Sequence, residues 1–194
     1  MTNDAAPVPP SMPQQSASVD VYAAFVGAID QATVQRIFSG LGSVMANKMQ
    51  RVHLLFQSTG GTVADGVCLY NFLHRLPIEI CLYNVGTVAS IGALAFLGAK
   101  VRNASASATF MLHRTQISPT GATAERLQAI TKNVALDDQR TEAILRYHLK
   151  MPDDLWEVHK TADLWLSAEE AVKYGLATKI AEFAPPFGSQ VFNV

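Results

Sequence analysis

The stretch Gly86-Thr-Val-Ala-Ser-Ile-Gly92 lies between an apolar run, residues 79–83, and an apolar segment of helical length that ends at residue 99. This order predicts a strand, a tight turn and a helix, with Ser90 at the turn. Open α/β folds bind their ligands where strands end and helices begin, and the amide after such a serine can face a developing oxyanion. A serine before a helix is more commonly a plain N-cap. The turn alone therefore allows two interpretations of Ser90, nucleophile or cap.

Short apolar runs and helix-length segments continue to alternate on both sides of this turn. The alternation predicts an α/β fold in which crossover helices cover a sheet. Ser167-Ala-Glu-Glu170 adds the serine cap and acidic first turn of a helix start. The expected strands are residues 19–26, 52–56, 79–83, 109–112 and 177–180, and the expected helices are residues 31–47, 63–73, 90–99, 123–149, 153–159 and 167–174.

The length of 194 residues suits one globular domain with a core of its own. We expect this domain to span residues 19–183. Residues 1–18 are rich in Pro, Ser and Gln, the composition of a disordered arm. We expect residues 184–194 to form a C-terminal tail, in which Phe187, Val191 and Phe192 could dock on the domain.

The charge balance and the cysteines limit the class of protein. The chain has 15 Lys and Arg against 16 Asp and Glu, so no field of one sign favours nucleic acid or an anionic membrane. Cys68 and Cys81 lie in apolar runs, as expected of buried free thiols in a reducing compartment. No apolar run reaches the roughly 20 residues that span a bilayer. We expect a cytoplasmic protein with no cofactor, and no His-Glu-x-x-His or paired Cys/His spacing suggests a metal site.

Two further segments carry reactive chemistry. Ser58-Thr-Gly-Gly61 follows the strand expected at residues 52–56, and a glycine pair there can leave N–H groups free for an oxyanion, although such pairs are usually only turns. Phe110-Met-Leu-His113 places a histidine directly after a strongly apolar strand, where it could act as a general base. Val88 stands two positions before Ser90, so the turn is not the Gly-x-Ser-x-Gly elbow of α/β-hydrolases.

Together these segments resemble the Clp protease proteolytic subunit family, in order and at similar spacing, from about residue 21 to residue 180. The most specific match is Asp163-Leu-Trp-Leu-Ser-Ala-Glu-Glu-Ala-Val-Lys-Tyr-Gly-Leu176. The resemblance implies a Ser-His-Asp triad. In it Ser90 would be the nucleophile, His113 the general base and Asp163 the acid that orients the imidazole, while the backbone N–H groups of Gly61 and Ile91 would form the oxyanion hole.

The resemblance also implies the architecture, a ClpP/crotonase-type spiral of βαβ units with a projecting handle helix at residues 123–149. In the family, this helix stacks two rings of seven subunits. Asp137, Asp138 and Thr141 interrupt its apolar stripe, so its middle is not expected to be a plain core. The segment Gln116-Ile-Ser-Pro-Thr-Gly-Ala122 matches the one that binds substrate peptides by strand addition. The implied substrate-binding residues are Gly60, Ser118, Thr120 and Gly121.

Three departures from the family pattern concern the glycine segment, ring assembly and control by a partner. Thr59 replaces the usual Pro before the glycine pair, and Ala162 replaces an Arg that helps to join the rings. Before residue 19, the chain has only the Pro-, Ser- and Gln-rich arm where the family has its axial loops. We therefore expect control by a hexameric ATPase unfoldase to be altered or absent, and ring stacking stays an open expectation.

The leading hypothesis is a serine endopeptidase that cuts unfolded proteins or peptides inside a ring-shaped homo-oligomer, with no nucleic acid or membrane partner. One alternative is a crotonase-type enzyme that binds acyl-coenzyme A and uses the same oxyanion hole on an enolate. Such enzymes do not generally need a serine and a histidine at these places, so Ser90, His113 and Asp163 favour the peptidase. The other alternative is an inactive ring subunit that assembles with an active paralogue.

Overall fold

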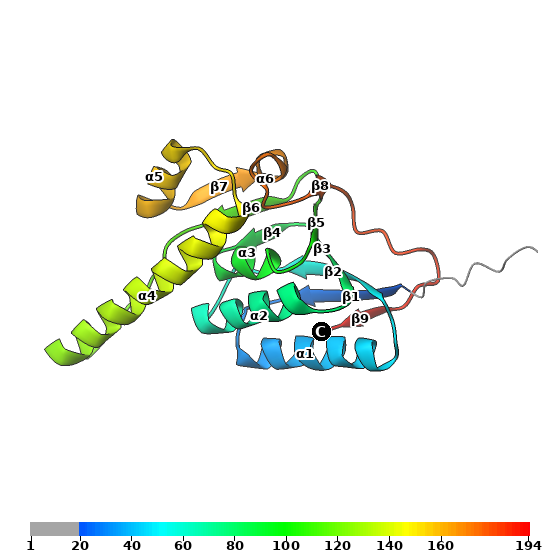
Figure 1. Ribbon diagram of the computed structural model, residues 1–194, viewed down its shortest axis with the longest axis horizontal. Helices are drawn as coiled ribbons and strands as arrows, with labels where there is room; N and C mark the ends of the chain where they lie inside the picture. Colours follow the sequence, from blue (N-terminus) through cyan, green and yellow to red (C-terminus); the bar gives the residue numbers. More distant parts are fainter. Residues whose placement is uncertain (1–19) are drawn as a thin grey trace, which may run out of the picture.

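A computed structural model of the protein describes residues 20–194. The arm expected at residues 1–18 lies outside the described residues. In the described part, the strands form two sheets (Figure 1). The strands are β1 (Val21–Val26), β2 (Arg51–Gln57), β3 (Glu79–Asn84), β4 (Thr87–Ala89), β5 (Val101–Ala104), β6 (Thr109–Leu112), β7 (Leu164–Ser167), β8 (Lys179–Ile180) and β9 (Val191–Asn193).

The larger sheet has six strands in the order β8-β5-β3-β2-β1-β9, and every neighbouring pair in it is parallel. The smaller sheet has the order β4-β6-β7, with β4 parallel and β7 antiparallel to β6. A single bridge from Ser58 to Val88 joins the end of β2 to β4. The carboxyl end of the large sheet therefore leads directly into the small one.

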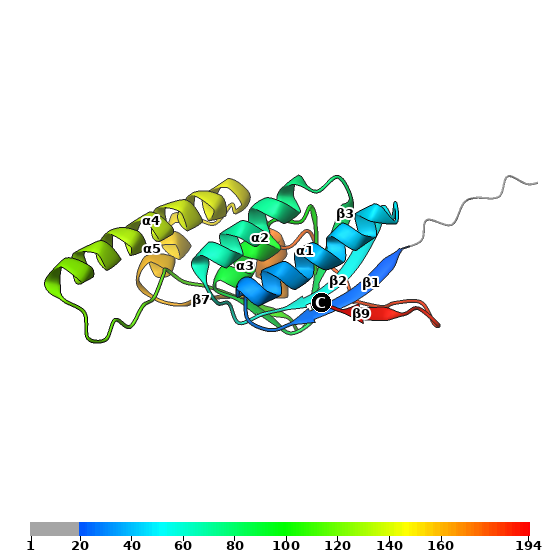
Figure 2. The same cartoon turned by 90° about the horizontal axis from the view of Figure 1, so that it is seen from below.

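Helices follow the strands in the alternation that the sequence predicts, which confirms the α/β class. Figure 2 shows α1 and α2 on one side of strands β1 and β2. This arrangement accounts for the strict alternation of more and less buried residues along β2, since successive side chains of a strand point to opposite faces. The helices are α1 (Gln31–Ala46), α2 (Val63–Arg75), α3 (Ile91–Phe96), α4 (Ala124–His148), α5 (Asp153–Thr161) and α6 (Ala168–Tyr174).

The predicted start of α6 is confirmed. The Ser167 hydroxyl accepts a hydrogen bond from the Glu170 amide at 3.2 Å, and the Glu170 carboxylate accepts one from the Ser167 amide at 2.9 Å. This reciprocal capping box satisfies two amides that the helix itself leaves unpaired. The short helix is thereby fixed directly after β7.

Four fully buried phenylalanines connect the two sheets through α3. Their ring centroids form a chain from Phe25 to Phe56 at 5.1 Å, to Phe96 at 6.0 Å and to Phe110 at 5.5 Å. Phe25 and Phe56 lie on the large sheet, Phe96 on α3 and Phe110 on the small sheet. Tilted aromatic contacts at these distances are favourable, so α3 is held between the sheets.

Helix α4 projects from the rest of the chain (Figure 1). Its buried residues are Asp137 and Leu145, and Leu127 and Leu136 on it are exposed. The expectation that the middle of this helix is no plain core is confirmed. A helix so exposed depends on few packing contacts of its own.

The structure differs from the expected element pattern at four short strands. The sequence analysis assigned no strand to the residues of β4, β5, β7 or β9, each only three or four residues long. β9 pairs with β1 in parallel, so Val191 and Phe192 of the expected C-terminal tail dock on the domain by extending the large sheet. Phe187 does not dock, because its side chain is fully exposed.

Two further observations concern the cysteines and the membrane. Both thiols are free, as expected, but Cys68 is exposed, because it lies on the outer side of α2, and Cys81 alone is buried. Over residues 20–194, no helix combines the length and the apolar character that crossing a membrane requires.

The close contact between α2 and α3 can be tested by substituting the glycine at which the two helices meet. A Cβ atom at Gly66 would collide with Cγ1 of Ile91 and lie 3.2 Å from its Cβ, whereas a Cβ atom at Gly42 on α1 would meet nothing within 4 Å. Alanine favours either helix by about 0.5–1 kcal/mol, but overpacking costs about 1–3 kcal/mol. We expect Gly66→Ala to lower the Tm and Gly42→Ala to raise it by a few degrees, as measured by thermal unfolding. Equal shifts in the two variants would contradict this close packing.

Candidate active site

Ser90 lies at the turn between β4 and α3 in a strained backbone conformation. Its φ is 56°, which non-glycine residues rarely adopt and which costs about 1–3 kcal/mol. Two backbone hydrogen bonds hold the turn: the Ala89 amide donates to the Ser58 carbonyl at 2.8 Å, and the Ser90 amide donates to the Met111 carbonyl at 2.8 Å. The Ser90 side chain makes no cap hydrogen bond to α3. Between the two interpretations left open by the sequence, the plain N-cap is therefore wrong.

His113 follows the last residue of β6 and faces this serine. Its Nε2 lies 2.7 Å from Ser90 Oγ. When the serine hydroxyl donates this hydrogen bond, the ring proton is on Nδ1. Nδ1 is buried and has no hydrogen-bond partner in the described part of the chain. The pair has the arrangement of a nucleophile and its general base, with the far side of the imidazole unsatisfied.

Asp163 follows His113 outward in the strand register but makes no hydrogen bond or ion pair with it among the described residues. The β6–β7 ladder pairs Met111 with Trp165 and Leu112 with Leu164, so the next pair outward is His113 and Asp163. Asp163 is exposed, and no hydrogen bond or ion pair within residues 20–194 joins it to His113. Of the three residues of the expected triad, the structure brings two together and holds the third beside them.

The glycine pair lies against the serine turn. Gly60 has a φ of 108°, and a Cβ atom there would lie 2.7 Å from Ser90 Cβ. The Gly60 amide donates to the buried Ser58 hydroxyl at 3.1 Å. By contrast, the amides of Gly61 and Ile91 donate no hydrogen bond to any described residue. These two N–H groups are available for an anion.

The hydroxyl of Ser58 is a feature that the sequence analysis did not single out. It accepts a hydrogen bond from the Gly60 amide, while the Gly61 amide is left out of the bridge between Gly61 and Ile29, in which the Gly60 carbonyl and the Thr62 amide are paired. The backbone of Ser58 also makes two hydrogen bonds to β4: its amide donates to the Thr87 carbonyl, and its carbonyl accepts from the Ala89 amide. No local signal in the sequence distinguishes this serine from any other before a turn.

A pocket of about 280 Å³ opens beside Ser90 and His113. Its walls combine apolar and polar side chains and come from α2, α3, the end of β6, the segment that follows β6 and the inner face of α4. Thr141 and Leu145 lie four residues apart on α4, so they share this face. The lining residues are Gly61, Val63, Ser90, Ile91, Leu94, Leu112, His113, Arg114, Thr115, Gln116, Thr141 and Leu145.

The four expected substrate-binding residues differ in their position: one is buried and three are exposed. Gly60 is buried behind Ser90. Ser118, Thr120 and Gly121 are exposed, and none of them lines this pocket. They belong to the stretch of residues 113–122, which forms neither helix nor strand. Its backbone therefore has no ladder partner in the described residues.

Two other kinds of site, a second pocket and a metal site, are candidate places for the chemistry. A larger apolar hollow of about 450 Å³ lies between α1, β1, β2 and β9, and neither Ser90 nor His113 lines it. Its lining contains no ionisable side chain. Within the part of the chain that the structure describes, no cluster of three or more His, Cys, Asp or Glu side chains could hold a metal ion.

The contact of Gly60 with Ser90 gives a test of the geometry. Gly60→Ala would push Ser90 out of place, and a displacement of about 1 Å can cost about 100-fold in rate. We expect about this loss in the rate at which a fluorophosphonate probe labels the protein. Gly188→Ala is the matched control, because Gly188 also has a positive φ, 84°, but has no atom near its Cβ position. Equal labelling rates in both variants would contradict the contact.

Comparisons with known proteins agree with the α/β fold. The Clp protease family model matches residues 18–184. Proteolytic subunit 3 of the ATP-dependent Clp protease from Rhizobium johnstonii is 27% identical over 171 residues, which are 86% of this chain and 84% of that protein. The corresponding subunit of Cyanophora paradoxa is 31% identical over 132 residues, 66% of this chain and 67% of that protein. The chain therefore belongs to the Clp protease family, a family of serine-type peptidases.

Proposed function

We propose that the protein hydrolyses peptide bonds with Ser90 as nucleophile and His113 as general base. The observation that supports this most strongly is the 2.7 Å hydrogen bond from Ser90 Oγ to His113 Nε2. In the proposed reaction, Ser90 Oγ attacks the scissile carbonyl carbon while its proton moves to Nε2. The imidazolium then protonates the leaving amine. In the second half, His113 takes a proton from a water molecule that attacks the acyl-enzyme, and it returns this proton to Ser90 Oγ as the acid product leaves.

We assign the oxyanion hole to the amides of Gly61 and Ile91. Both are unpaired among the described residues, and both border the pocket that Ser90 enters. Backbone amides fixed before the reaction stabilise the negative oxygen of the tetrahedral intermediate without reorganising, and one such donor is typically worth about 100- to 1,000-fold in rate. The rigid glycine turn supports this role.

We propose that Asp163 completes the triad when subunits assemble. A buried donor without a partner costs about 1–3 kcal/mol, so Nδ1 of His113 favours any nearby acceptor. The carboxylate closest in the strand register is that of Asp163, one step beyond the last pair of the β6–β7 ladder. A small movement at the start of β7 would bring the two together. Asp163 would then hold the imidazole tautomer and stabilise the imidazolium.

The substrate we propose is an extended segment of an unfolded protein or a peptide. Residues 113–122 run from His113 to the start of α4 without a ladder partner, so a peptide could pair with them as an added strand. Ser118, Thr120 and Gly121 would lie along that peptide. The pocket beside Ser90 would hold an apolar side chain, because Val63, Leu94 and Leu145 line it.

We further propose that the chain works as a homo-oligomeric ring of seven subunits, as the resemblance to the family implies. The exposed leucines of the projecting α4, Leu127 and Leu136, support contacts between subunits. Ala162, where the family has Arg, cannot make a charged contact between rings. Free cysteines fit a reducing compartment such as the cytoplasm.

The first test removes the nucleophile. We expect Ser90→Ala to abolish hydrolysis of an unstructured fluorescent peptide and labelling by a fluorophosphonate, while the far-UV circular dichroism spectrum and the native mass stay unchanged. Ser107→Ala is the control, since Ser107 is exposed in the turn between β5 and β6. Labelling that persists in Ser90→Ala would rule out this nucleophile.

The second test concerns the acid. We expect Asp163→Asn to lower kcat of the assembled protein by about 100- to 10,000-fold, because loss of the triad carboxylate can cost about four orders of magnitude. Asp154→Asn, at an exposed position on α5, should keep the full kcat. Steady-state kinetics on fractions separated by native mass give the comparison. An unchanged kcat in Asp163→Asn would mean that Ser90 and His113 act without this acid.

A further inference from the structure

The backbone that carries His113 leaves its sheet immediately before this residue. β6 ends at Leu112, where the β6–β7 ladder also ends. Before His113, the main chain is restrained by the Ser90 amide, which donates to the Met111 carbonyl at 2.8 Å. From His113 onward, no strand pairing within the described part of the chain restrains residues 113–122. The position of the imidazole therefore depends on what holds the residues directly after it.

Asp138 on α4 holds both of those residues. Its Oδ1 accepts a hydrogen bond from the Thr115 amide at 2.8 Å. Its Oδ2 lies 3.0 Å from Arg114 Nε in an ion pair. One carboxylate thus fixes the main chain of Thr115 and the side chain of Arg114, which follow His113 directly. We call these two contacts the Asp138 clamp.

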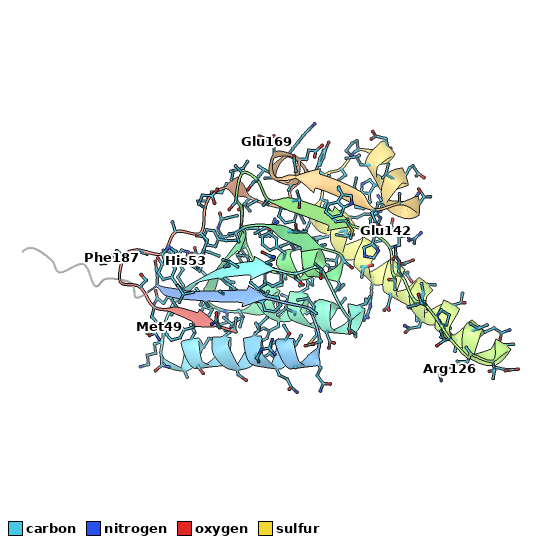
Figure 3. The ribbon with its side chains drawn as sticks, turned by 180° about the vertical axis from the view of Figure 1, so that it is seen from behind. Met49, His53, Arg126, Glu142, Glu169 and Phe187 are labelled. Carbon is cyan, nitrogen blue, oxygen red and sulfur yellow. The ribbon has the colours of Figure 1, made fainter. Side chains whose placement is uncertain are left out.

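The clamp is built into a larger set of contacts on the inner part of α4. Glu142, one helical turn further on, lies 3.8 Å from Arg114 and also accepts from Arg146 Nε at 2.8 Å. The Arg146 guanidinium lies 4.2 Å from the centre of the Trp156 ring on α5. Figure 3 shows Glu142 on the part of α4 that lies against the rest of the chain, and Arg126 toward its free end. The clamp is therefore located where α4 is best anchored.

Burial makes the clamp more specific than an ordinary surface ion pair. The Asp138 side chain is only 14% exposed, whereas most surface pairs are fully hydrated and worth little. A carboxylate so poorly hydrated needs a charged or hydrogen-bonding partner. Among the described residues, Arg114 is the cation that reaches it. His159 lies nearby on α5, but burial lowers the pKa of its imidazole, so it carries no positive charge at neutral pH.

We propose that Asp138 is a positioning residue for the reaction: through Arg114 and Thr115 it holds the end of β6 so that His113 keeps its hydrogen bond to Ser90. This inference rests on the proposed function of Ser90 and His113. Asp138 does not line the pocket beside Ser90, so it acts through its neighbours and not on the substrate. The orientation of the general base is thereby set by α4, the helix that projects from the protein.

The chain supplies a closely matched control in the preceding residue. Asp137 is also on α4 and also poorly exposed, with 12% of its side chain accessible, and it forms an ion pair with Arg140 at 2.7 Å. The Asp137 carboxylate contacts Arg140 and Asn133, both on α4, and the one contact of Asp137 with the pocket wall, from the Thr141 hydroxyl, is made by its main-chain carbonyl, which Asp137→Ala keeps. Comparing Asp138→Ala with Asp137→Ala therefore separates the loss of the clamp from the general loss of a buried aspartate on this helix.

The experiment measures the two variants and the wild-type protein as full chains in their native assembly. We expect Asp138→Ala to lower kcat for a fluorescent peptide and the rate of fluorophosphonate labelling by about 10- to 100-fold, because small displacements of a base cost about this much. KM should stay within about 2-fold, and Tm and native mass should equal those of Asp137→Ala. Asp138→Asn, which can still accept from the Thr115 amide, should lose less activity than Asp138→Ala.

Three results would overturn the role of Asp138. These are equal kcat and labelling rates in Asp138→Ala and Asp137→Ala, a rise in KM with kcat retained, or a loss of activity that follows a larger drop in Tm or native mass than in Asp137→Ala. The last would assign Asp138 to the fold or the assembly. A wild-type protein in which the probe does not react with Ser90 would instead refute the proposed function, and this result is distinct from all three.

Discussion

The site depends on one strained residue, since the backbone of Ser90 must keep a positive φ for its hydroxyl to meet His113. Neither sheet could impose this conformation alone. The carbonyl of Ser58, at the end of the large sheet, fixes the residue before the turn, and the carbonyl of Met111, in the small sheet, fixes Ser90 itself. Ser90, the proposed nucleophile, is therefore placed by the junction of the two sheets, and its geometry is only as precise as that junction.

The same junction places the groups that would face the developing oxyanion. Gly60 packs against Ser90 at a distance that leaves no room for a side chain, and Gly66 does the same against Ile91. One close contact thus sets the distance from the glycine turn to the serine, and the other sets the distance from α2 to the first amide of α3. Because glycine makes both contacts, the glycine turn and the first turn of α3 lie close to Ser90, and Gly61 and Ile91 border the same pocket.

Local patterns in the sequence predicted those elements that local interactions stabilise. The capping box of Ser167 and Glu170 and the alternation along β2 need no knowledge of distant residues, and the structure contains both. β9 could not be found in this way, because its three residues become a strand only by pairing with β1, at the other end of the chain. For the same reason, the resemblance to the family brought out Ser90 and His113, but not Ser58, whose role is a hydrogen bond inside a turn. Asp138 was noticed only as an interruption of an apolar stripe.

That interruption has a physical reason, which connects α4 with the chemistry. A helix that only filled a core would carry leucine or valine at this position, yet a carboxylate there is needed to bind a main-chain amide and a guanidinium together. Thr141 and Leu145, further along the same helix, line the pocket beside Ser90. A change in the direction of α4 would therefore move the general base and the pocket at once. The other end of α4 projects away from the rest of the chain and exposes Leu127, so the helix that holds the residues after His113 is also the one that a neighbouring subunit of the proposed ring would contact.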